Sequence, residues 1–454
     1  MGNFTFYAPT RVYFGRKEEE QIGSILKQEG CHRVLVHYGG QSAVKSGLLD
    51  RVLASLKKAG ISAVTLGGVV PNPQLSKVRE GIALAKKEQV DFILAVGGGS
   101  VIDSAKGIGY GVVNEGDVWE YYARRKKVTG CLPVGAILTI AAAGSEMSNS
   151  SVITNEDGWL KRGLSSDYGR CRFAIMNPEL TMTLPPYQTA SGCTDIILHT
   201  MERYFIKENN MDITDGFAES LMRTVMKHTR ILMKEPNNYE SRAEVMWAGS
   251  LSHNDITGSR SFGDWACHQL EHELSGMYKV AHGAGLAAVW GSWARYVYQE
   301  QPSRFAQYAR NVMGMSGANS TEFDKDTKYP VIDIMIDQKN IENMGGTMRL
   351  GAYPCVLKEG TLAKELYSEE LIHERHRHRF EFNNKFKDEI QKAGLLISGN
   401  SPDGTLAEIV ELSKEVHPFF IAGQFHPEFK TRPNNPHPLF RGFVEAIYKK
   451  QYNK

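Results

Sequence analysis

Five potential metal ligands are spaced so that they can share helix faces. Asp195 and His199 stand four residues apart in a segment with helical periodicity, so on a helix they project from one side. His268 and His272 repeat that spacing, and His282 follows in the same region. Carboxylate and imidazole ligands suit iron(II), zinc, nickel or cobalt. A lone histidine is more often a hydrogen-bonded structural residue, but two such pairs and a further histidine favour a metal centre.

A glycine-rich turn at residues 97–100 joins an expected strand to an expected helix. Glycines let the backbone approach a pyrophosphate, and the helix N-terminus offers free N–H groups with a favourable dipole. The pattern is not G-x-G-x-x-G, so an ordinary strand-to-helix turn is the alternative. A second loop of small residues, 139–146, also follows a strand. Two such loops in one region favour a dinucleotide cleft.

The end of the first strand of this region bears on the choice of dinucleotide. An Asp or Glu near such a strand end usually meets the ribose of NAD. This chain has Gly39 there, with Ser42 and Lys45 close behind. Because no acid would repel a 2′-phosphate, the sequence favours NADP over NAD.

The elements that must position these residues follow from hydrophobic periodicity. Residues 33–114 read as βαβαβ, which predicts a parallel sheet with right-handed crossovers. Another strand is expected at 132–139 and a hairpin at 150–169, whereas 185–315 is almost entirely helical. We therefore expect a Rossmann-like α/β dinucleotide-binding domain at 1–184 and an all-α metal-binding domain at 185–315. Strand signals return in a third region, 317–454.

Composition excludes several other classes of protein. The chain has 454 residues and a net charge of +2, which argues against a role based on binding nucleic acid or membrane surfaces. No apolar run approaches the roughly 18 residues of a membrane span, and the N-terminus has no apolar signal region. The six cysteines form no C-x-x-C pair, so we expect reduced thiols and a cytoplasmic location.

The first 315 residues resemble the iron-containing alcohol dehydrogenase family, particularly its butanol dehydrogenase-like branch. The resemblance rests on GGGSVIDSAK, TIAAAGSEM, TDIILH and HQLEHELSG with a following AHG. It implies a divalent metal, Fe²⁺ or alternatively Zn²⁺, a nicotinamide cofactor, small primary alcohols or aldehydes as substrates, and possible homodimers. It makes Asp195, His199, His268 and His282 the ligands, and His272 a nearby proton-relay residue. It also assigns to the cofactor site Asn72, Gly98, Gly99, Ser100, Thr139 and Lys161.

The C-terminal region carries motifs of a different enzyme. GGTMRLG, ERHRHR and QFHPEF, within residues 317–450, resemble the class I glutamine amidotransferase domain of CTP synthase. The resemblance implies that His426 is a general base, that Glu428 orients it, and that Glu322 and Arg379 hold glutamine. A thiol nucleophile needs such an imidazole and carboxylate beside it.

This third region is expected to be an incomplete α/β fragment. The family places its nucleophilic Cys N-terminal to the matched segment, where this chain is still dehydrogenase-like, and Cys355 lacks the glycines of a nucleophile elbow. The helical domain is expected to be truncated at the same junction. Three interpretations follow: a metal-dependent alcohol dehydrogenase, a CTP synthase fragment that has lost its nucleophile and its ligase domain, or a chimeric chain without stable function.

Overall fold

The computed structural model describes residues 3–206, 211–258, 263–315, 331–334, 349–378, 380–432 and 434–452. The chain divides into two compact units, Met1–Glu322 and Phe323–Lys454, which are described separately. Within these described ranges, no helix combines the length and the apolar character that crossing a membrane requires.

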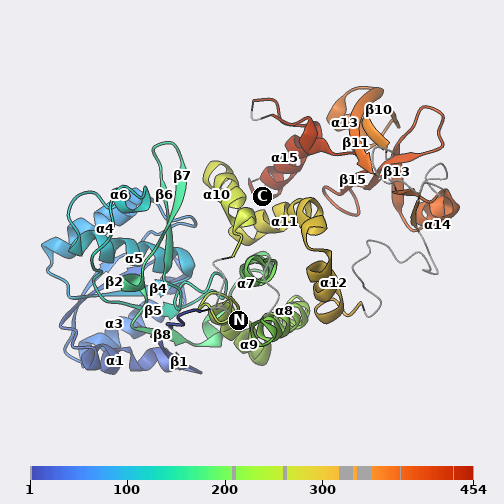
Figure 1. Ribbon diagram of the computed structural model, residues 1–454. Coiled ribbons are helices and arrows are strands. Elements are labelled where there is room, and N and C mark those ends of the chain that lie inside the picture. The colour runs from blue at the N-terminus through green and yellow to red at the C-terminus, as the bar shows by residue number, and fades with distance from the viewer. Residues whose placement is uncertain are drawn as a thin grey trace. The chain divides into compact units, whose positions relative to one another are not determined.

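The first unit begins with a six-stranded sheet in which every pairing is parallel. Its order is β1-β8-β5-β4-β2-β3 (Figure 1). The strands span Arg11–Phe14 (β1), Arg33–Tyr38 (β2), Ser62–Leu66 (β3), Phe92–Gly97 (β4), Val134–Leu138 (β5) and Phe173–Met176 (β8). This confirms the expected parallel sheet. Because the strand order reverses between β2 and β4, their carboxyl ends border the crevice in which such sheets bind ligands.

Helices cover both faces of this sheet, as a buried parallel sheet requires. One core packs residues of α4 (Leu75–Lys87) and α5 (Gly99–Val113) against the sheet, and a second core does the same with α1 (Ile22–Gln28) and α3 (Leu48–Lys58). The shorter helices α2 (Ser42–Lys45) and α6 (Trp119–Tyr122) follow β2 and α5 along the chain. The strands are therefore hydrophobic on both sides, with β4 and β5 buried throughout.

An antiparallel hairpin leaves the sheet, as the sequence predicts. It pairs β6 (Ser150–Asn155) with β7 (Leu160–Ser165). The buried ammonium of Lys106 on α5 fixes the base of the hairpin by donating to the carbonyls of Ser145, Ser148 and Ser150 at 2.7–2.8 Å. Asp103 on the same helix accepts the backbone N–H of Val152 at 3.0 Å. The helix that follows the glycine-rich turn thus anchors the hairpin.

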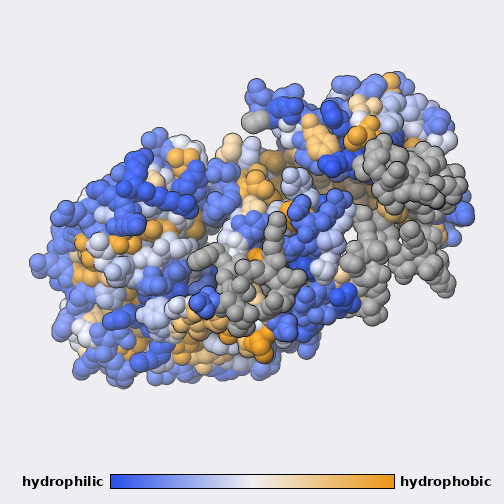
Figure 2. Space-filling model, in the orientation of Figure 1, coloured by the Kyte–Doolittle hydropathy of each residue, from blue (hydrophilic) through white to orange (hydrophobic). Residues whose placement is uncertain are grey.

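The remainder of the first unit is helical. It consists of α7 (Pro186–Tyr204), α8 (Asp212–Leu232), α9 (Tyr239–Ser252), α10 (Ala266–Tyr278), α11 (His282–Val297) and α12 (Pro302–Asn311). Helix α7 packs against α8, α9 and α11, so the segment with the first two expected ligands lies inside the helical layer. Helix α11 is apolar along its length, yet only three of its residues are buried. Apolar side chains are visible among charged ones on the surface of this region (Figure 2).

The second unit is built on a five-stranded sheet of order β11-β10-β13-β14-β15. The strands span Arg349–Leu357 (β10), Leu371–His378 (β11), Leu395–Asn400 (β13), Ala407–Leu412 (β14) and Ile421–Gly423 (β15). A separate pair joins β9 (Ile332–Ile334) to β12 (Phe380–Phe382), and the helices are α13 (Leu362–Tyr367), α14 (Lys387–Lys392) and α15 (Pro438–Tyr452). Every described pairing in this unit is antiparallel.

Candidate metal centre

Helix α7 presents Asp195 and His199 from one face. Both side chains are almost fully buried. His199 Nδ1 lies 3.0 Å from the Asp195 backbone carbonyl oxygen, which can only accept a hydrogen bond, so Nδ1 carries the proton. The same nitrogen lies 2.9 Å from Asp195 Oδ1 without hydrogen-bond geometry. The Nε2 lone pair of His199 therefore remains for another partner.

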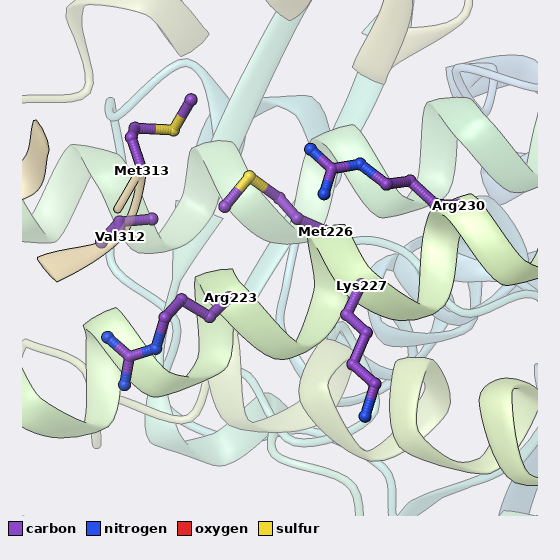
Figure 3. A pocket seen from close by; sticks show the side chains of 6 residues that line it. All are labelled: Arg223, Met226, Lys227, Arg230, Val312 and Met313. Atoms are coloured by element: carbon purple, nitrogen blue, oxygen red, sulfur yellow. The ribbon is translucent and has the colours of Figure 1, made fainter. Parts of the chain in front are cut away.

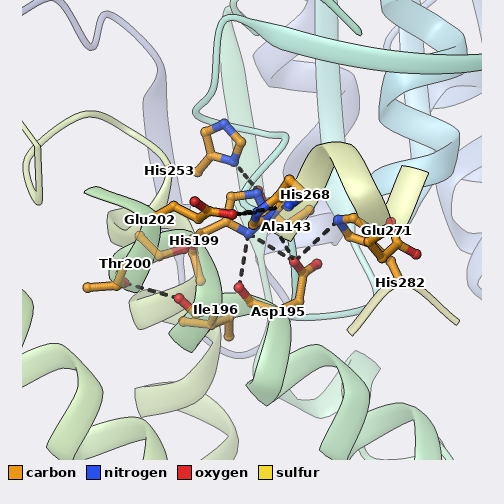
Figure 4. A network of polar contacts seen from close by, with 12 residues as sticks. Ala143, Asp195, Ile196, His199, Thr200, Glu202, His253, His268, Glu271 and His282 are labelled. Carbon is orange, nitrogen blue, oxygen red and sulfur yellow. Dashed lines mark hydrogen bonds and ion pairs between the residues drawn. The ribbon is translucent and has the colours of Figure 1, made fainter. Parts of the chain in front are cut away.

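Helices α10 and α11 bring two more imidazoles to the same carboxylate. His268 Nε2 lies 4.0 Å and His282 Nε2 3.7 Å from Asp195 Oδ1. Ligand atoms of Asp195, His268 and His282 all fall within 4.8 Å of one another. The ring of His199 is 4.4 Å from that of His268 and 6.4 Å from that of His282. Three of the four predicted ligands thus gather at one point, with the ring of His199 beside them, and the four residues come from α7, α10 and α11 (Figure 4).

Glycine at position 283 makes this approach possible. A Cβ there would stand 1.9 Å from the carbonyl oxygen of Ser191 on α7. Without a side chain, the first turn of α11 can lie directly against α7, and His282 at the start of α11 reaches Asp195. Any larger residue at position 283 would push His282 away from the centre.

Two buried carboxylates set the tautomers of the other histidines. Glu202 Oε1 accepts from the His268 backbone N–H at 3.0 Å and from His268 Nδ1 at 2.9 Å. Glu271 Oε2 accepts from Nδ1 of His282. In both imidazoles the proton is on Nδ1 and the Nε2 lone pair faces Asp195, which is the arrangement of a carboxylate–histidine–metal triad.

This donor set fits a divalent transition metal. Asp195 Oδ1 and His268 Nε2 are buried and have no hydrogen-bond partner among the described residues. Leaving such polar atoms unsatisfied in a protein interior is costly, and a cation would satisfy both. One carboxylate and three imidazoles match the nitrogen and oxygen ligands that iron(II) and zinc accept.

The electrostatics of the site favour the metal-binding protonation states. Burial lowers the pKa of His268 well below its usual value, and burial lowers that of His272 to about 2, so both rings are neutral. Burial alone would raise the pKa of Asp195, but the neighbouring His199 and His282 bring it below its usual value. Metals bind neutral imidazole and ionised carboxylate, so no proton has to leave these groups first.

His272 lies one helical turn beyond His268, half-buried, with its ring 5.8 Å from that of His282. Its ligand atoms also group with those of Glu271 and His282. It therefore lies beside the predicted ligands but is not grouped with Asp195.

Sequence reasoning missed three neighbours of the ligands. Glu202 and Glu271 each follow a predicted ligand by three residues, a spacing that puts them on the ligand's helix face and could have identified them. His253 carried no such signal, because it comes from the end of α9. Its ring lies 4.3 Å from that of His199, and its Nδ1 donates to the carbonyl of Ala143 at 2.8 Å.

The two small-residue loops lie side by side at the carboxyl ends of β4 and β5. The N–H of Thr139 donates to the carbonyl of Gly97 at 3.0 Å. A Cβ on Gly98 would stand 3.1 Å from the Ile140 side chain, and one on Gly99 would stand 3.2 Å from Ser145 Oγ, so side chains of the second loop pack closely against these glycines. Gly98 caps α5, and Ser100 lies in its first turn. Gly99 and Ser100 thus lie at the N-terminus of α5, a position that in general favours anions.

The other predicted cofactor residues lie in different surroundings. Gly39 follows β2, and Ser42 begins α2 with an exposed side chain. Asn72 has a φ of 56° in the turn before α4. Lys161 is on β7 and buried, with its Nζ 3.3 Å from Glu271 Oε2 and 2.7 Å from Ser275 Oγ. Its ammonium is thus held by protein groups on α10.

Of the residues predicted for amidotransferase chemistry, the structure describes His426 and Glu428. His426 Nδ1 lies 2.7 Å from Glu428 Oε1, as a base and its orienting carboxylate would. Cys355 is fully buried on β10, where burial raises its pKa to about 12. Glu322 and Arg379, the predicted glutamine-binding residues, lie outside the described residues.

A cavity of about 220 Å³ lies elsewhere in the helical region (Figure 3). It is lined by Arg223, Met226, Lys227, Arg230, Val312 and Met313. None of the predicted ligands or cofactor residues contributes to it. The positively charged side chains that line the cavity are exposed and belong to α8, so no buried polar group lines it.

Comparison with known proteins identifies two regions. Residues 9–178 match the iron-containing alcohol dehydrogenase model, and residues 189–344 match the C-terminal model of the Fe-containing alcohol dehydrogenase family. The NADH-dependent butanol dehydrogenase A of Clostridium acetobutylicum is 40% identical over 316 residues, covering 69% of this chain and 81% of that protein. The NADPH-dependent aldehyde reductase YqhD of Escherichia coli is 35% identical, covering 71% and 83%.

The structural comparison agrees with the sequence comparison. The crystal structure of NADH-dependent butanol dehydrogenase A from Thermotoga maritima superposes with a TM-score of 0.69 at 42% identity. That match covers 72% of this chain and 80% of the solved chain.

The second region matches a different family. Residues 305–446 match the class I glutamine amidotransferase model, overlapping the end of the dehydrogenase match. CTP synthase of Caldanaerobacter subterraneus is 59% identical over 147 residues, which cover 32% of this chain and 27% of that protein. The chain therefore spans about a quarter of the length of this relative.

Proposed function

The chain belongs to the iron-containing alcohol dehydrogenase family, and from that premise we propose that it interconverts small primary alcohols and their aldehydes. The proposal rests mainly on the grouping of ligand atoms of Asp195, His268 and His282 within 4.8 Å of one another, with the ring of His199 4.4 Å from that of His268. When bound there, a divalent cation would polarise the substrate oxygen while a nicotinamide exchanges hydride with the substrate carbon.

Asp195, His199, His268 and His282 would hold the metal, with Fe²⁺ first and Zn²⁺ second among candidates. Asp195 contributes one negative charge, and Glu202 and Glu271 make the imidazoles of His268 and His282 stronger donors by accepting their Nδ1 protons. The buried walls exclude water, which strengthens each of these interactions.

His272 is proposed to exchange a proton with the substrate oxygen. Its neutral ring can accept the hydroxyl proton of an alcohol, and its protonated form can return that proton to an aldehyde undergoing reduction. Its half-buried position beside the ligands gives it contact with both the site and its surroundings.

The dinucleotide is proposed to dock its pyrophosphate on the N–H groups of Gly98, Gly99 and Ser100 at the start of α5. Thr139, on the neighbouring loop, and Asn72 would flank it, and Gly39 and Ser42 would face the ribose. We expect NADP to bind more tightly than NAD, because Gly39 stands where an acid would contact the NAD ribose. Titration with both cofactors checks this: tighter binding of NAD would contradict the preference, and no binding of either would contradict the docking site.

The amidotransferase region supports only a second, weaker proposal. A CTP synthase-like glutaminase would need a thiol beside His426, and the described cysteine of this unit, Cys355, is a buried strand residue. We propose that the region is a fragment without amide-transfer activity. We also propose that the helical domain lacks its last helices, consistent with the sparse burial of α11. A chain without any stable function is the remaining alternative.

The test of the main proposal uses the full chain freed of metal with a chelator. Butanal reduction by NADPH or NADH should be absent from the metal-free protein and should return when Fe²⁺ or Zn²⁺ is added under anaerobic conditions. Absence of reduction with every metal and both cofactors would contradict the proposed function.

A further inference from the structure

Lys161 occupies an unusual position for a residue of the nucleotide-binding half. Its side chain is only 5% exposed, although it comes from the β6–β7 hairpin. Its Nζ contacts Glu271 Oε2 at 3.3 Å and donates to Ser275 Oγ at 2.7 Å, both on α10. A buried ammonium is costly unless it is paired, and Glu271 is the anion that pairs with it.

Glu271 joins this lysine to the metal centre. The side chain is fully buried, and the oxygen that contacts Lys161 also accepts the Nδ1 proton of His282. The carboxylate therefore has one cation on one side and one predicted metal ligand on the other. Without Lys161, the shared oxygen of Glu271 would lose one of its two partners, and the carboxylate could rotate away from His282.

We propose that Lys161 and Glu271 are positioning residues for the metal, through which the hairpin holds His282 in its ligating orientation and tautomer. The inference rests on the proposed function, because it presumes a metal at Asp195. Lys161 holds the Glu271 carboxylate in place through their contact, and Glu271 fixes Nδ1–H of His282 so that Nε2 faces Asp195.

The hairpin can carry this role because its own base is fixed. Lys106 and Asp103 on α5 bind its first strand and the loop before it. The connection therefore runs from the helix after the glycine-rich turn, through β7, to the metal ligand on α11. Through this connection, Lys161 of the nucleotide-binding half contacts Glu271, which positions the predicted metal ligand His282.

The adjacent pair on the same two elements provides a matched control. Arg162 contacts Glu273 at 2.9 Å, but these side chains are 40% and 56% exposed and do not touch a ligand. Removing this exposed pair should change neither the metal site nor the fold appreciably.

The experiment measures the metal dissociation constant of the full chain by competition with a chelator of known affinity, using Zn²⁺ as the probe. Lys161→Met and Glu271→Gln should each weaken binding about 10- to 100-fold, as loss of such outer partners does elsewhere. The double variant should be no weaker than the worse single variant, because both act through one interaction. Arg162→Met and Glu273→Gln should bind as the unaltered protein does.

The outcomes separate this inference from the proposed function. If the unaltered chain binds no metal, both fail; if it binds metal and Lys161→Met binds equally well, only the inference fails. A lower thermal midpoint of the metal-free variant with an unchanged dissociation constant would make Lys161 merely structural and would overturn the inference. Additive losses in the double variant would also overturn it.

If Lys161→Met does not fold, Ser275→Ala removes one partner of the ammonium and should weaken metal binding in the same direction. Unchanged binding in Ser275→Ala would overturn the proposal.

Discussion

Both units of this chain contain a histidine oriented by a carboxylate, yet only one unit builds a centre around it. In the first unit, Glu202 and Glu271 hold His268 and His282 in a buried setting, and the opposite ring nitrogens face Asp195. In the second unit, Glu428 holds His426, with side chains 54% and 34% exposed.

This difference shows what a histidine–carboxylate pair contributes to the chemistry of a site. The carboxylate sets the tautomer of the ring, but the chemistry depends on what stands at the other nitrogen. The first unit supplies Asp195 and two further imidazoles from other helices. The second unit supplies no thiol at His426 from its described residues, because Cys355 is buried on a central strand.

The strongest test of the comparison replaces one carboxylate in each unit. Asp195→Asn should remove metal binding and with it several kcal/mol of transition-state stabilisation, so aldehyde reduction should fall about a thousandfold or more. Glu428→Gln should leave the rate unchanged. Steady-state kinetics of both variants measure this, and comparable losses in the two would show that the units do not differ as described.

Much of the first site could be predicted because several of its residues are only a few positions apart in the sequence. Asp195 and His199, or His268 and His272, share a helix face by sequence separation alone, and the hairpin and parallel strands follow from periodicity. The contact of Lys161 with Glu271 could not be predicted, because it joins residues 110 positions apart through packing of β7 on α10.

The second unit was harder to predict for a related reason. Its motifs identify a family, but the sheet pairing depends on which strands are available to pair. The described strands pair antiparallel, a pairing that the motifs alone did not predict. Glu322 and Arg379 remain predictions, since they lie outside the described residues.

The second prediction concerns stability and contrasts buried with exposed ion pairs. Arg304 on α12 pairs with Asp215 on α8, both almost fully buried, and also donates to the Tyr204 carbonyl at 2.7 Å. Arg304→Met should lower the free energy of unfolding of the first unit by about 3–5 kcal/mol. Lys414→Met, at an exposed pair with Glu365 in the second unit, should cost under about 1 kcal/mol there.

Urea unfolding can assign the first of these changes to its unit. All six tryptophans lie in the first unit, so their fluorescence reports its unfolding alone. Circular dichroism of the whole chain follows both units. A loss below about 1 kcal/mol for Arg304→Met would mean that α12 contributes little to the helical layer.

A smaller effect is expected at the cofactor ribose. Lys45, exposed at the end of α2, should contribute up to about 1 kcal/mol to a 2′-phosphate, so Lys45→Ala should weaken NADPH binding at most about fivefold. NADH binding should not change, which makes it the internal control. Equal weakening for both cofactors would place Lys45 outside the 2′-phosphate site.

No effect at all is expected from Cys355→Ala on amide chemistry. With burial raising its pKa to about 12, Cys355 stays a protonated thiol at neutral pH, and thiolate is the nucleophilic form. The unaltered chain should release no ammonia from glutamine above background, and it should react slowly with thiol reagents at this position. Ammonia release that disappears in Cys355→Ala would make this cysteine a relocated nucleophile.

The proposal to be tested is that the working site of this chain is the metal centre at Asp195 in its first unit. Its most direct test is a titration of the metal-free full chain with Fe²⁺ under anaerobic conditions, following butanal reduction by NADPH. We expect the rate of butanal reduction to rise linearly and to stop rising at one metal per chain, and we expect no rise in Asp195→Asn. Activity that is independent of added metal, or equal in Asp195→Asn, would contradict it.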